Sequence, residues 1–304
     1  MLFSIALILL VGMFAGWLCK KLYLPSLLGM ILTGILLGPY ALNMIDSSIL
    51  SISSELRRIA LIIILTRAGL SLDIESLKKV GRPAVLMCFV PACFEMLGMV
   101  LLAPRLLGIS VLDAAIMGAV IAAVSPAVIV PKMLKLMENG YGEEKGIPQL
   151  ILAGAAVDDV FVIVIFSVFT GLAQGASITP MSFVKIPVSI ISGIVVGATV
   201  DISYVKTAGL AAVILIFGVL VFRMVGVFIC LLGTKLSMKE RVFCMIAYTP
   251  KATVQAAIGG IPLSMGLACG NLVLAVAVLA ILITAPLGAF MIDCTYKRLL
   301  TKGW

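Results

Sequence analysis

Two stretches decide the architecture of this chain: GLSLDIESLKKVGRPAVLMCFVPACFEMLG at residues 69–98 and GATVDISYVKTAGLAAVILIFGVLVFRMVG at residues 197–226. They align without a gap, because residue numbers in the second stretch exceed those in the first by a constant 128. Their identical pairs are Gly69/Gly197, Asp73/Asp201, Ile74/Ile202, Lys78/Lys206, Gly81/Gly209, Ala84/Ala212, Val85/Val213, Phe89/Phe217, Phe94/Phe222, Met96/Met224 and Gly98/Gly226. Apolar matches arise by chance in an apolar chain, but a shared register of glycines, an aspartate and a lysine does not. The sequence therefore contains an internal repeat.

The composition of the chain places it in a membrane. Of its 304 residues 62% are hydrophobic and 12% are charged, and the mean hydropathy is +1.26, whereas about a quarter of the residues are charged in soluble domains. Unpaired backbone groups are costly in hydrocarbon, so only helices or a closed barrel can span a bilayer. The apolar runs have the length of helices and lack the alternation of barrel strands. We predict an all-α, polytopic membrane protein.

Ten apolar segments predict ten membrane-spanning helices, at about residues 3–18, 24–41, 57–72, 84–104, 111–136, 148–173, 183–200, 208–232, 240–266 and 270–292. The net charge of +8 comes from short basic clusters between these segments. Such clusters are typical of cytoplasmic loops, so we exclude nucleic acid as a partner. Lys20 and Lys21 follow the first apolar run, the reverse of a secretory signal, and the N-terminus is predicted outside. The seven cysteines form no CxxC pair and predict neither a disulfide nor a metal site.

Prolines interrupt two of the apolar segments at nearly the repeat offset, at Ser125-Pro126 and Thr249-Pro250. A proline inside a helix removes a backbone donor and clashes with the preceding turn. One alternative is a simple kink in each helix. Because the two breaks are repeat-related and Lys251 follows the second, we predict a pair of discontinuous helices near the middle of the membrane, where Lys251 offsets a negative helix end. Internal symmetry with matched helix breaks is typical of secondary transporters.

Two adjacent carboxylates, Asp158 and Asp159, lie about ten residues into the segment that starts near Pro148, close to the bilayer centre. A charged carboxylate at that depth costs at least about 2.5 kcal/mol, and two neighbours cannot both ionise cheaply without a cation. Protons and a metal cation therefore exclude each other from such a site. For either aspartate alone, the alternative is a structural ion pair. We predict that Asp158 and Asp159 bind the metal cation and the proton.

Glu95 and Arg223 are repeat equivalents of opposite charge, and both lie deep in their segments. Arginine does not release its proton in proteins, so Arg223 is predicted to be a fixed cation that holds a carboxylate ionised. The sequence leaves open whether its partner is Glu95 or Asp158. It also leaves open whether Gln255 joins two helices or belongs to the site. Two further charged residues are predicted at the membrane interface, Arg67 and Asp73.

Four segments of the chain resemble the sodium/proton exchanger domain of the monovalent cation:proton antiporter superfamily. They are TRAGLSLD at residues 66–73, AVSPAVIVP at 123–131, GAAVDD at 154–159 and YTPKATVQAAIG at 248–259. The last segment is similar to the branch that also includes animal mitochondrial and plasma-membrane sodium/proton antiporters. The resemblance covers nearly the whole chain.

The resemblance implies an inverted-repeat fold with a dimerisation domain and a core domain, in which Asp158 and Asp159 bind ion and proton where two broken helices cross. Carried over by position, the crossing is marked by Ser125, Pro126, Thr249, Pro250 and Lys251. Many members have a lysine where this chain has Arg223, so the stoichiometry of those relatives does not carry over. The family's second half normally opens with further helices, which the sequence lacks. We therefore expect a first repeat over residues 1–173, with about six helices, and a partial second repeat over 183–292, with about four.

The function that we expect is exchange of Na⁺, or Li⁺ or K⁺, for H⁺ by alternating access. The protein is expected to be a multi-pass homodimer in the lipid bilayer of a microbial cell membrane, without enzymatic activity and without cofactors other than the transported ions. One alternative is a sodium-coupled organic-anion symporter, which the lack of a cationic pocket disfavours. A further alternative is an intramembrane aspartyl protease, which needs two aspartates that face each other from different helices. Neighbouring residues on one helix point about 100° apart and cannot converge on one scissile bond, so this alternative is disfavoured. A truncated, non-functional antiporter is a further alternative.

The charges of the loops indicate that helices are absent. With the N-terminus outside, three basic clusters fall on the cytoplasmic side, as the positive-inside rule requires: Lys20/Lys21, Lys78/Lys79/Arg82 and Lys132/Lys135/Lys145. Counting one helix at 183–200 then places two clusters outside, Lys235/Lys239/Arg241 and Lys297/Arg298/Lys302. We therefore predict that an odd number of helices is missing and that a deletion joins two helices near Gly193 to Ala198. Such a chain would build the Asp158 half but would not assemble a working inverted-repeat site.

Overall fold

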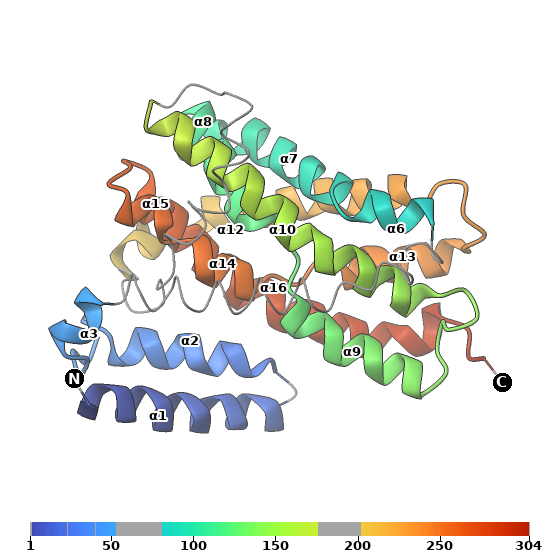
Figure 1. The fold of residues 1–304 in the computed structure, drawn as a ribbon, viewed down its shortest axis with the longest axis horizontal. Coiled ribbons are helices and arrows are strands. Elements are labelled where there is room, and N and C mark those ends of the chain that lie inside the picture. Colours follow the sequence, from blue (N-terminus) through green and yellow to red (C-terminus); the bar gives the residue numbers. More distant parts are fainter. Residues whose placement is uncertain (1, 23, 40, 53–80, 176–201, 304) are drawn as a thin grey trace.

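The structure is a computed structural model that describes residues 2–22, 24–39, 41–52, 81–175 and 202–303. Its helices are α1 (Leu2–Lys21), α2 (Ser26–Leu37), α3 (Ser47–Ser51), α6 (Arg82–Met87), α7 (Val90–Leu107), α8 (Val111–Ala122), α9 (Pro126–Glu138), α10 (Ile147–Ala173), α12 (Ile202–Cys230), α13 (Met238–Ala247), α14 (Thr253–Ile258), α15 (Ile261–Ser264) and α16 (Gly270–Leu299). In these ranges β-structure is limited to one isolated bridge, between Tyr141 and Lys302. Figure 1 shows α1 and α2 as a hairpin along one side of the bundle. The predicted all-α fold is confirmed.

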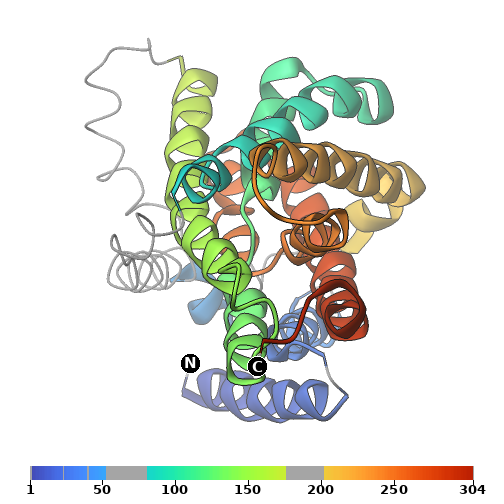
Figure 2. The same cartoon turned by 90° about the vertical axis from the view of Figure 1, so that its right-hand side faces the viewer.

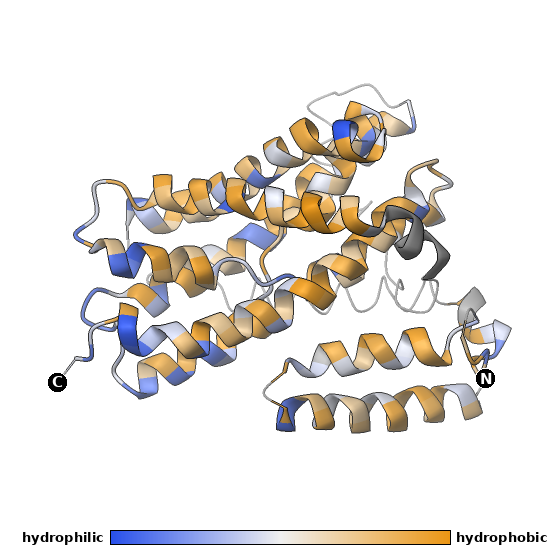
Figure 3. Ribbon diagram, turned by 180° about the vertical axis from the view of Figure 1, so that it is seen from behind, coloured by the Kyte–Doolittle hydropathy of each residue, from blue (hydrophilic) through white to orange (hydrophobic). Residues whose placement is uncertain are grey.

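Six described helical stretches are long and apolar enough to cross a membrane: Phe3–Lys21, Arg82–Leu107, Val111–Glu138, Ile147–Ala173, Gly209–Cys230 and Gly270–Leu299. Figure 3 shows hydrophobic residues along these helices, with hydrophilic residues gathered toward the end where the C-terminus lies. The predicted polytopic membrane architecture is confirmed. The predicted helices at 57–72 and 183–200, with Arg67 and Asp73, lie outside the described residues.

Helices α7 and α12 show that the repeat is inverted. A Cβ atom added to Gly98 would lie 2.7 Å from Phe222 Cγ, and one added to Gly226 would lie 3.1 Å from Phe94 Cβ. Under the offset of 128 residues these are the same contact made twice, since each glycine meets the phenylalanine of the other copy. Residue numbers rise along α7 as they fall along α12, so the two helices are antiparallel. Glycine is required at both positions because the helices approach closely there.

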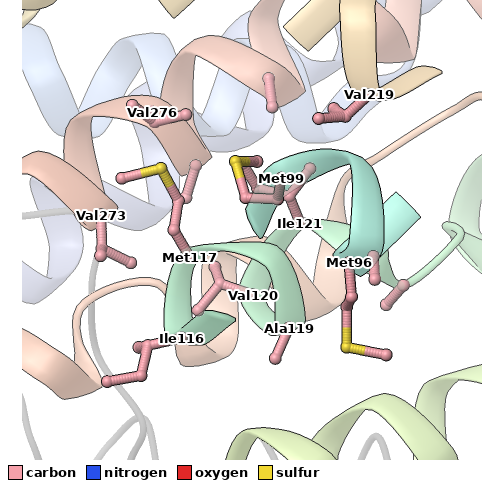
Figure 4. Close-up of a cluster of buried hydrophobic side chains, with 14 of the residues drawn as sticks. Met96, Met99, Ile116, Met117, Ala119, Val120, Ile121, Val219, Val273 and Val276 are labelled. Carbon is pink, nitrogen blue, oxygen red and sulfur yellow. The ribbon is translucent and has the colours of Figure 1, made fainter. Parts of the chain in front are cut away.

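The last helices of each repeat are antiparallel as well. Helix α10 begins in one hydrophobic cluster, at Ile147, and ends in a second cluster, at Phe166. Helix α16 runs the other way, from Val273 in the second cluster to Ile292 in the first. Figure 4 shows the second cluster, in which side chains of α7, α8, α12 and α16 meet. Both repeats therefore supply a first helix, a broken helix and a last helix to one bundle.

The basic loops of the two repeats meet at one end of this bundle, which we call the basic end. Lys145 Nζ, after α9, lies 2.9 Å from Glu240 Oε2 on α13. The same loop pairs with the C-terminal segment, where Gly142 N donates to Thr301 O over 2.9 Å. Figure 2 views the bundle from this side, with the C-terminus facing the reader.

Counting one helix at residues 183–200 would place Lys235/Lys239/Arg241 and Lys297/Arg298/Lys302 outside, and their positions in the described helices differ from that count. Those residues share the basic end with Lys132, Lys135 and Lys145, because α12 and α16 end where α10 begins. The prediction that an odd number of helices is missing stays a prediction, because residues 183–200 lie outside the described residues. In the structure α10 ends and α12 begins at the opposite end of the bundle, where Ala173 and Ala212 join the same cluster.

Cysteine labelling in oriented vesicles tests this arrangement. The exposed native thiols Cys93 and Cys294 are first replaced by serine, and a cysteine is introduced at Lys302 on the basic end or at exposed Ala268 on the opposite end. We expect an impermeant maleimide to label position 302 only from the cytoplasmic side and position 268 only from the other side, because basic ends stay cytoplasmic. Labelling of both positions from one side would contradict the fold.

Candidate functional site

Two helix breaks form the centre of the molecule. Helix α8 ends at Ala122 and α9 begins at Pro126, and Ala123 and Ser125 between them are extended, with ψ angles of 141° and 107°. In the second repeat, α13 ends at Ala247 and α14 begins at Thr253. The two broken stretches cross and share a backbone hydrogen bond, in which Ser125 N donates to Pro250 O over 2.9 Å. The discontinuous pair predicted from the prolines is present.

Arg223 satisfies the carbonyl ends of both half-helices. Its Nε donates to Tyr248 O, at the end of α13, over 2.7 Å, and its Nη1 donates to Ala122 O, at the end of α8. These carbonyls have no partner within their own helices and form the negative ends of the helix dipoles. The sequence assigned this role to Lys251, whose Nζ also reaches Ala122 O, but over 3.5 Å. Arg223 is therefore the principal cap, a role that sequence reasoning missed.

Two carboxylates and two cations are buried together beside the crossing. Glu95 Oε2 lies 2.7 Å from Arg223 Nη1 and 2.6 Å from Lys251 Nζ. Asp158 Oδ2 lies 3.0 Å from Arg223 Nη2 and accepts a hydrogen bond from Val124 N over 2.8 Å. The sequence left open whether Arg223 pairs with Glu95 or with Asp158; in the structure Arg223 bridges the two carboxylates. We call Glu95, Asp158, Arg223 and Lys251 the charge quartet, in which two negative charges face two positive ones.

Asp159 stands beside the quartet without a partner. Its side chain is 1% exposed, and neither carboxylate oxygen has a hydrogen-bond partner among the described residues. Asp158 Oδ1 and the Ser125 hydroxyl are also buried and also have no hydrogen-bond partner among the described residues. A buried ionised carboxylate without a partner is strongly unfavourable, so Asp159 requires a proton or a cation. Carboxylate and hydroxyl oxygens are the donors that hard cations take.

The position of the aspartates follows from the length of α10. This helix has 27 residues and Asp158 is its twelfth, about 16 Å from its start at 1.5 Å per residue. The pair therefore lies near the middle of the helix, as predicted. In the part of the chain that the structure describes, no three His, Cys, Asp or Glu side chains converge as in a polydentate metal centre.

The remaining predicted residues build the walls of the crossing. The Thr249 hydroxyl donates to Ile246 O over 2.8 Å, and Pro250 packs against Gly288 of α16. Of the two roles left open for Gln255, the structure shows that it joins the two broken helices. Its Nε2 donates to Ala123 O over 2.6 Å, and its Oε1 accepts from Ala252 N over 2.8 Å. Two contributors have no sequence signal of their own: Thr284, which accepts from Lys251 N over 3.0 Å, and Val124.

Comparison with known proteins gives concordant matches. The family model for the transmembrane sodium/hydrogen exchanger matches residues 5–196 and 194–297. Sodium/hydrogen exchanger 9B2 of Homo sapiens is 31% identical over 379 residues, which cover 92% of this chain and 70% of that protein. The Xenopus tropicalis protein of the same name is 28% identical over 408 residues, covering 99% and 75%. A solved structure, the sodium proton antiporter MjNhaP1 from Methanocaldococcus jannaschii at pH 8, shares the fold with a TM-score of 0.78 at 17% identity, covering 98% of this chain and 99% of that one.

Proposed function

The chain belongs to the sodium/hydrogen exchanger family and exchanges Na⁺ for H⁺ across a membrane, and we propose that the exchange takes place at Asp159. One observation carries this proposal: Asp159 is a buried carboxylate whose oxygens have no hydrogen-bond partner among the described residues, and it adjoins Asp158, which bonds to Val124 in the first helix break. A proton or a cation can neutralise it, and the two exclude each other. Asp158 Oδ1 and the Ser125 hydroxyl complete the oxygen set around the ion.

The residues divide the work as follows. Arg223 and Lys251 balance the charges of Glu95 and Asp158 and close the helix ends, so the crossing stays assembled whether or not an ion is bound. Asp159 gives up its proton on one side of the membrane and takes the cation there. After the site turns to face the other side, the cation leaves and a proton returns. The site thus carries the same net charge when it moves the cation across the membrane and when it moves the proton back.

Exchange is therefore expected to be electroneutral, with one H⁺ for each cation. The charges of the quartet sum to zero, so the Asp159 carboxylate is the group that binds either one proton or one monovalent cation. The proteoliposomes are acidic inside and hold a pH dye. External NaCl should release protons at the same initial rate whether or not valinomycin and K⁺ clamp the membrane potential. Choline chloride is the control and should release none. A rate that the clamp raises severalfold would show net charge movement and contradict the balanced quartet.

The finer assignments belong to the same proposal. The cations are Na⁺ and Li⁺, which match a site of few hard oxygen donors. The membrane is the cytoplasmic membrane of a microbe, and the protein is a homodimer in the lipid bilayer. Helix α1 exposes a row of large apolar residues that lipid or a second copy can cover: Leu10, Met13, Phe14 and Trp17. Neither alternative, organic-anion symport or a non-functional product, gains support from the comparisons.

We also propose that relatives carry additional chain between α10 and α12. The two matches of the family model meet at residues 194–196, and the alignment with the human relative, at 379 positions, is longer than this 304-residue chain by 75. The deletion predicted near Gly193 to Ala198 lies outside the described residues. The described helices of both repeats meet at the crossing; that this chain would not assemble a working site stays a prediction.

A further inference from the structure

Tyr248 contacts Arg223 from two directions. Its backbone carbonyl accepts Arg223 Nε over 2.7 Å, and its ring centroid lies 5.3 Å from Arg223 Cζ, within the range of a cation–π contact. The side chain of Tyr248 is fully buried. The guanidinium that pairs with Asp158 is therefore contacted by both the backbone carbonyl and the ring of one residue of the broken helix.

The far end of the Tyr248 side chain is fixed by a break in another helix. Pro91 has no N–H, so the carbonyl four residues earlier, at Met87, loses its helical partner, and α6 ends there. The Tyr248 hydroxyl donates to this carbonyl over 3.4 Å. A proline in the first repeat thus creates the acceptor that orients a tyrosine of the second repeat.

Gly154 of α10 provides the space for the hydroxyl. A Cβ atom at this position would overlap Tyr248 Oη, and it would lie 2.8 Å from Met87 Cβ and 3.3 Å from Tyr248 Cζ. Gly154 precedes Asp158 by four residues and so lies on the same face of α10, one turn away. The helix that carries the aspartates and the residue that supports Arg223 therefore meet at a position where only glycine fits.

We infer that Tyr248 is a positioning residue for cation binding: seated in the niche at Gly154, it holds Arg223 where it pairs with Asp158, and through Asp158 it sets the place of the ion beside Asp159. This inference rests on the proposed exchange at Asp159. Tyr248 does not touch the ion. Its displacement moves Arg223, and Asp158 then loses the orientation that its two bonds on Oδ2 impose.

The test is a split between KM for Na⁺ and maximal rate in proteoliposomes. Gly154→Ala pushes the hydroxyl out of its niche, and Tyr248→Leu removes the ring face, so each should raise KM by about 2- to 10-fold, the worth of a net hydrogen bond, with maximal rate unchanged. Tyr248→Phe keeps the ring and loses only the 3.4 Å hydrogen bond to Met87 O, so its KM should rise less than that of Tyr248→Leu. The double variant Gly154→Ala/Tyr248→Phe removes the overlap of the added methyl with the hydroxyl but not its 2.8 Å approach to Met87 Cβ, so it should recover part of the loss in KM.

The matched control is Gly218→Ala on α12. Its Cβ would lie 2.7 Å from Leu102 Cδ1, a flexible side-chain end, and it touches neither Tyr248 nor the quartet, so KM should not change. If Gly154→Ala fails to fold, Tyr248→Leu against Tyr248→Phe still decides the question. Wild-type KM in folded Gly154→Ala or Tyr248→Leu, or a Tyr248→Phe variant as impaired as Tyr248→Leu, overturns the inference. A wild-type chain without Na⁺-dependent proton release, or an active Asp159→Asn, would instead overturn the proposed function.

Discussion

Asp159→Asn should abolish cation-induced proton release and leave only the leak of protein-free vesicles. The amide cannot carry a proton in exchange for a cation, and it has no charge with which to hold one. Because the native carboxylate has no partner, the substitution breaks no hydrogen bond of the described residues, so the variant should fold normally. Transport in proteoliposomes, with size-exclusion profile and melting temperature measured in parallel, checks both statements.

Asp158→Asn should abolish exchange for a different reason. It leaves Arg223 and Lys251 facing only Glu95, so one positive charge is unbalanced beside Asp159. That charge takes the place of the transported cation and holds Asp159 ionised without an ion. The control is Asp113→Asn, which lies in the first turn of α8, at the end of that helix away from the crossing, and should keep normal exchange. Normal exchange by either Asp158→Asn or Asp159→Asn would remove the central claim.

Arg223→Ala should give the largest loss of stability of any single change at the site. It leaves Asp158 without its cation and removes the donors to Ala122 O and Tyr248 O. Breaking a buried ion pair by removing one partner costs about 3–5 kcal/mol. Glu95→Ala should also destabilise, since it leaves two buried cations. The double variant should lose less than the two single losses added, by about 0.5–3 kcal/mol, as measured by unfolding midpoints in mixed detergent micelles.

The chain provides a matched control pair for this cycle. Lys132 on α9 and Asp293 on α16 also form an ion pair between the repeats, but their side chains are 21% and 34% exposed. An exposed pair contributes about 0–1 kcal/mol, so breaking it should shift the midpoint little. Additive losses at Glu95 and Arg223, or losses as small as those of the control pair, would show that burial does not strengthen the quartet as we infer.

The sequence predicts those parts of the site that depend on local chemistry. Prolines mark both helix breaks, the repeat offset makes Glu95 and Arg223 equivalent positions of opposite charge, and the length of the apolar segment predicts Asp158 and Asp159 near mid-membrane. Each of these features follows from one segment or from a comparison of two segments in register. The number of helices between α10 and α12 stays a prediction, because residues 176–201 lie outside the described ranges.

Contacts between distant segments account for what the sequence did not predict. Arg223 donates to Ala122 O, 101 residues away, and to Tyr248 O, 25 residues away, and no pattern in one helix specifies either carbonyl. Lys251 was expected at a helix end, yet its closest partner is Glu95 in the other repeat. The niche at Gly154 depends on a carbonyl that Pro91 frees in a third helix. Backbone carbonyls leave no trace in a sequence until the fold brings them together.

The reciprocal contact between α7 and α12 has a consequence for the divergence of the two repeats. Near a pseudo-two-fold axis each position of one copy meets its own counterpart, and Glu95 and Arg223 are such counterparts, joined over 2.7 Å. Two identical copies would place like charges face to face there, in hydrocarbon, which is untenable. The two repeats must therefore differ in sequence at the positions that meet on the pseudo-two-fold axis. Duplication of one repeat produces the two-fold arrangement of helices. The core becomes stable when the two copies carry residues of opposite charge at positions 95 and 223.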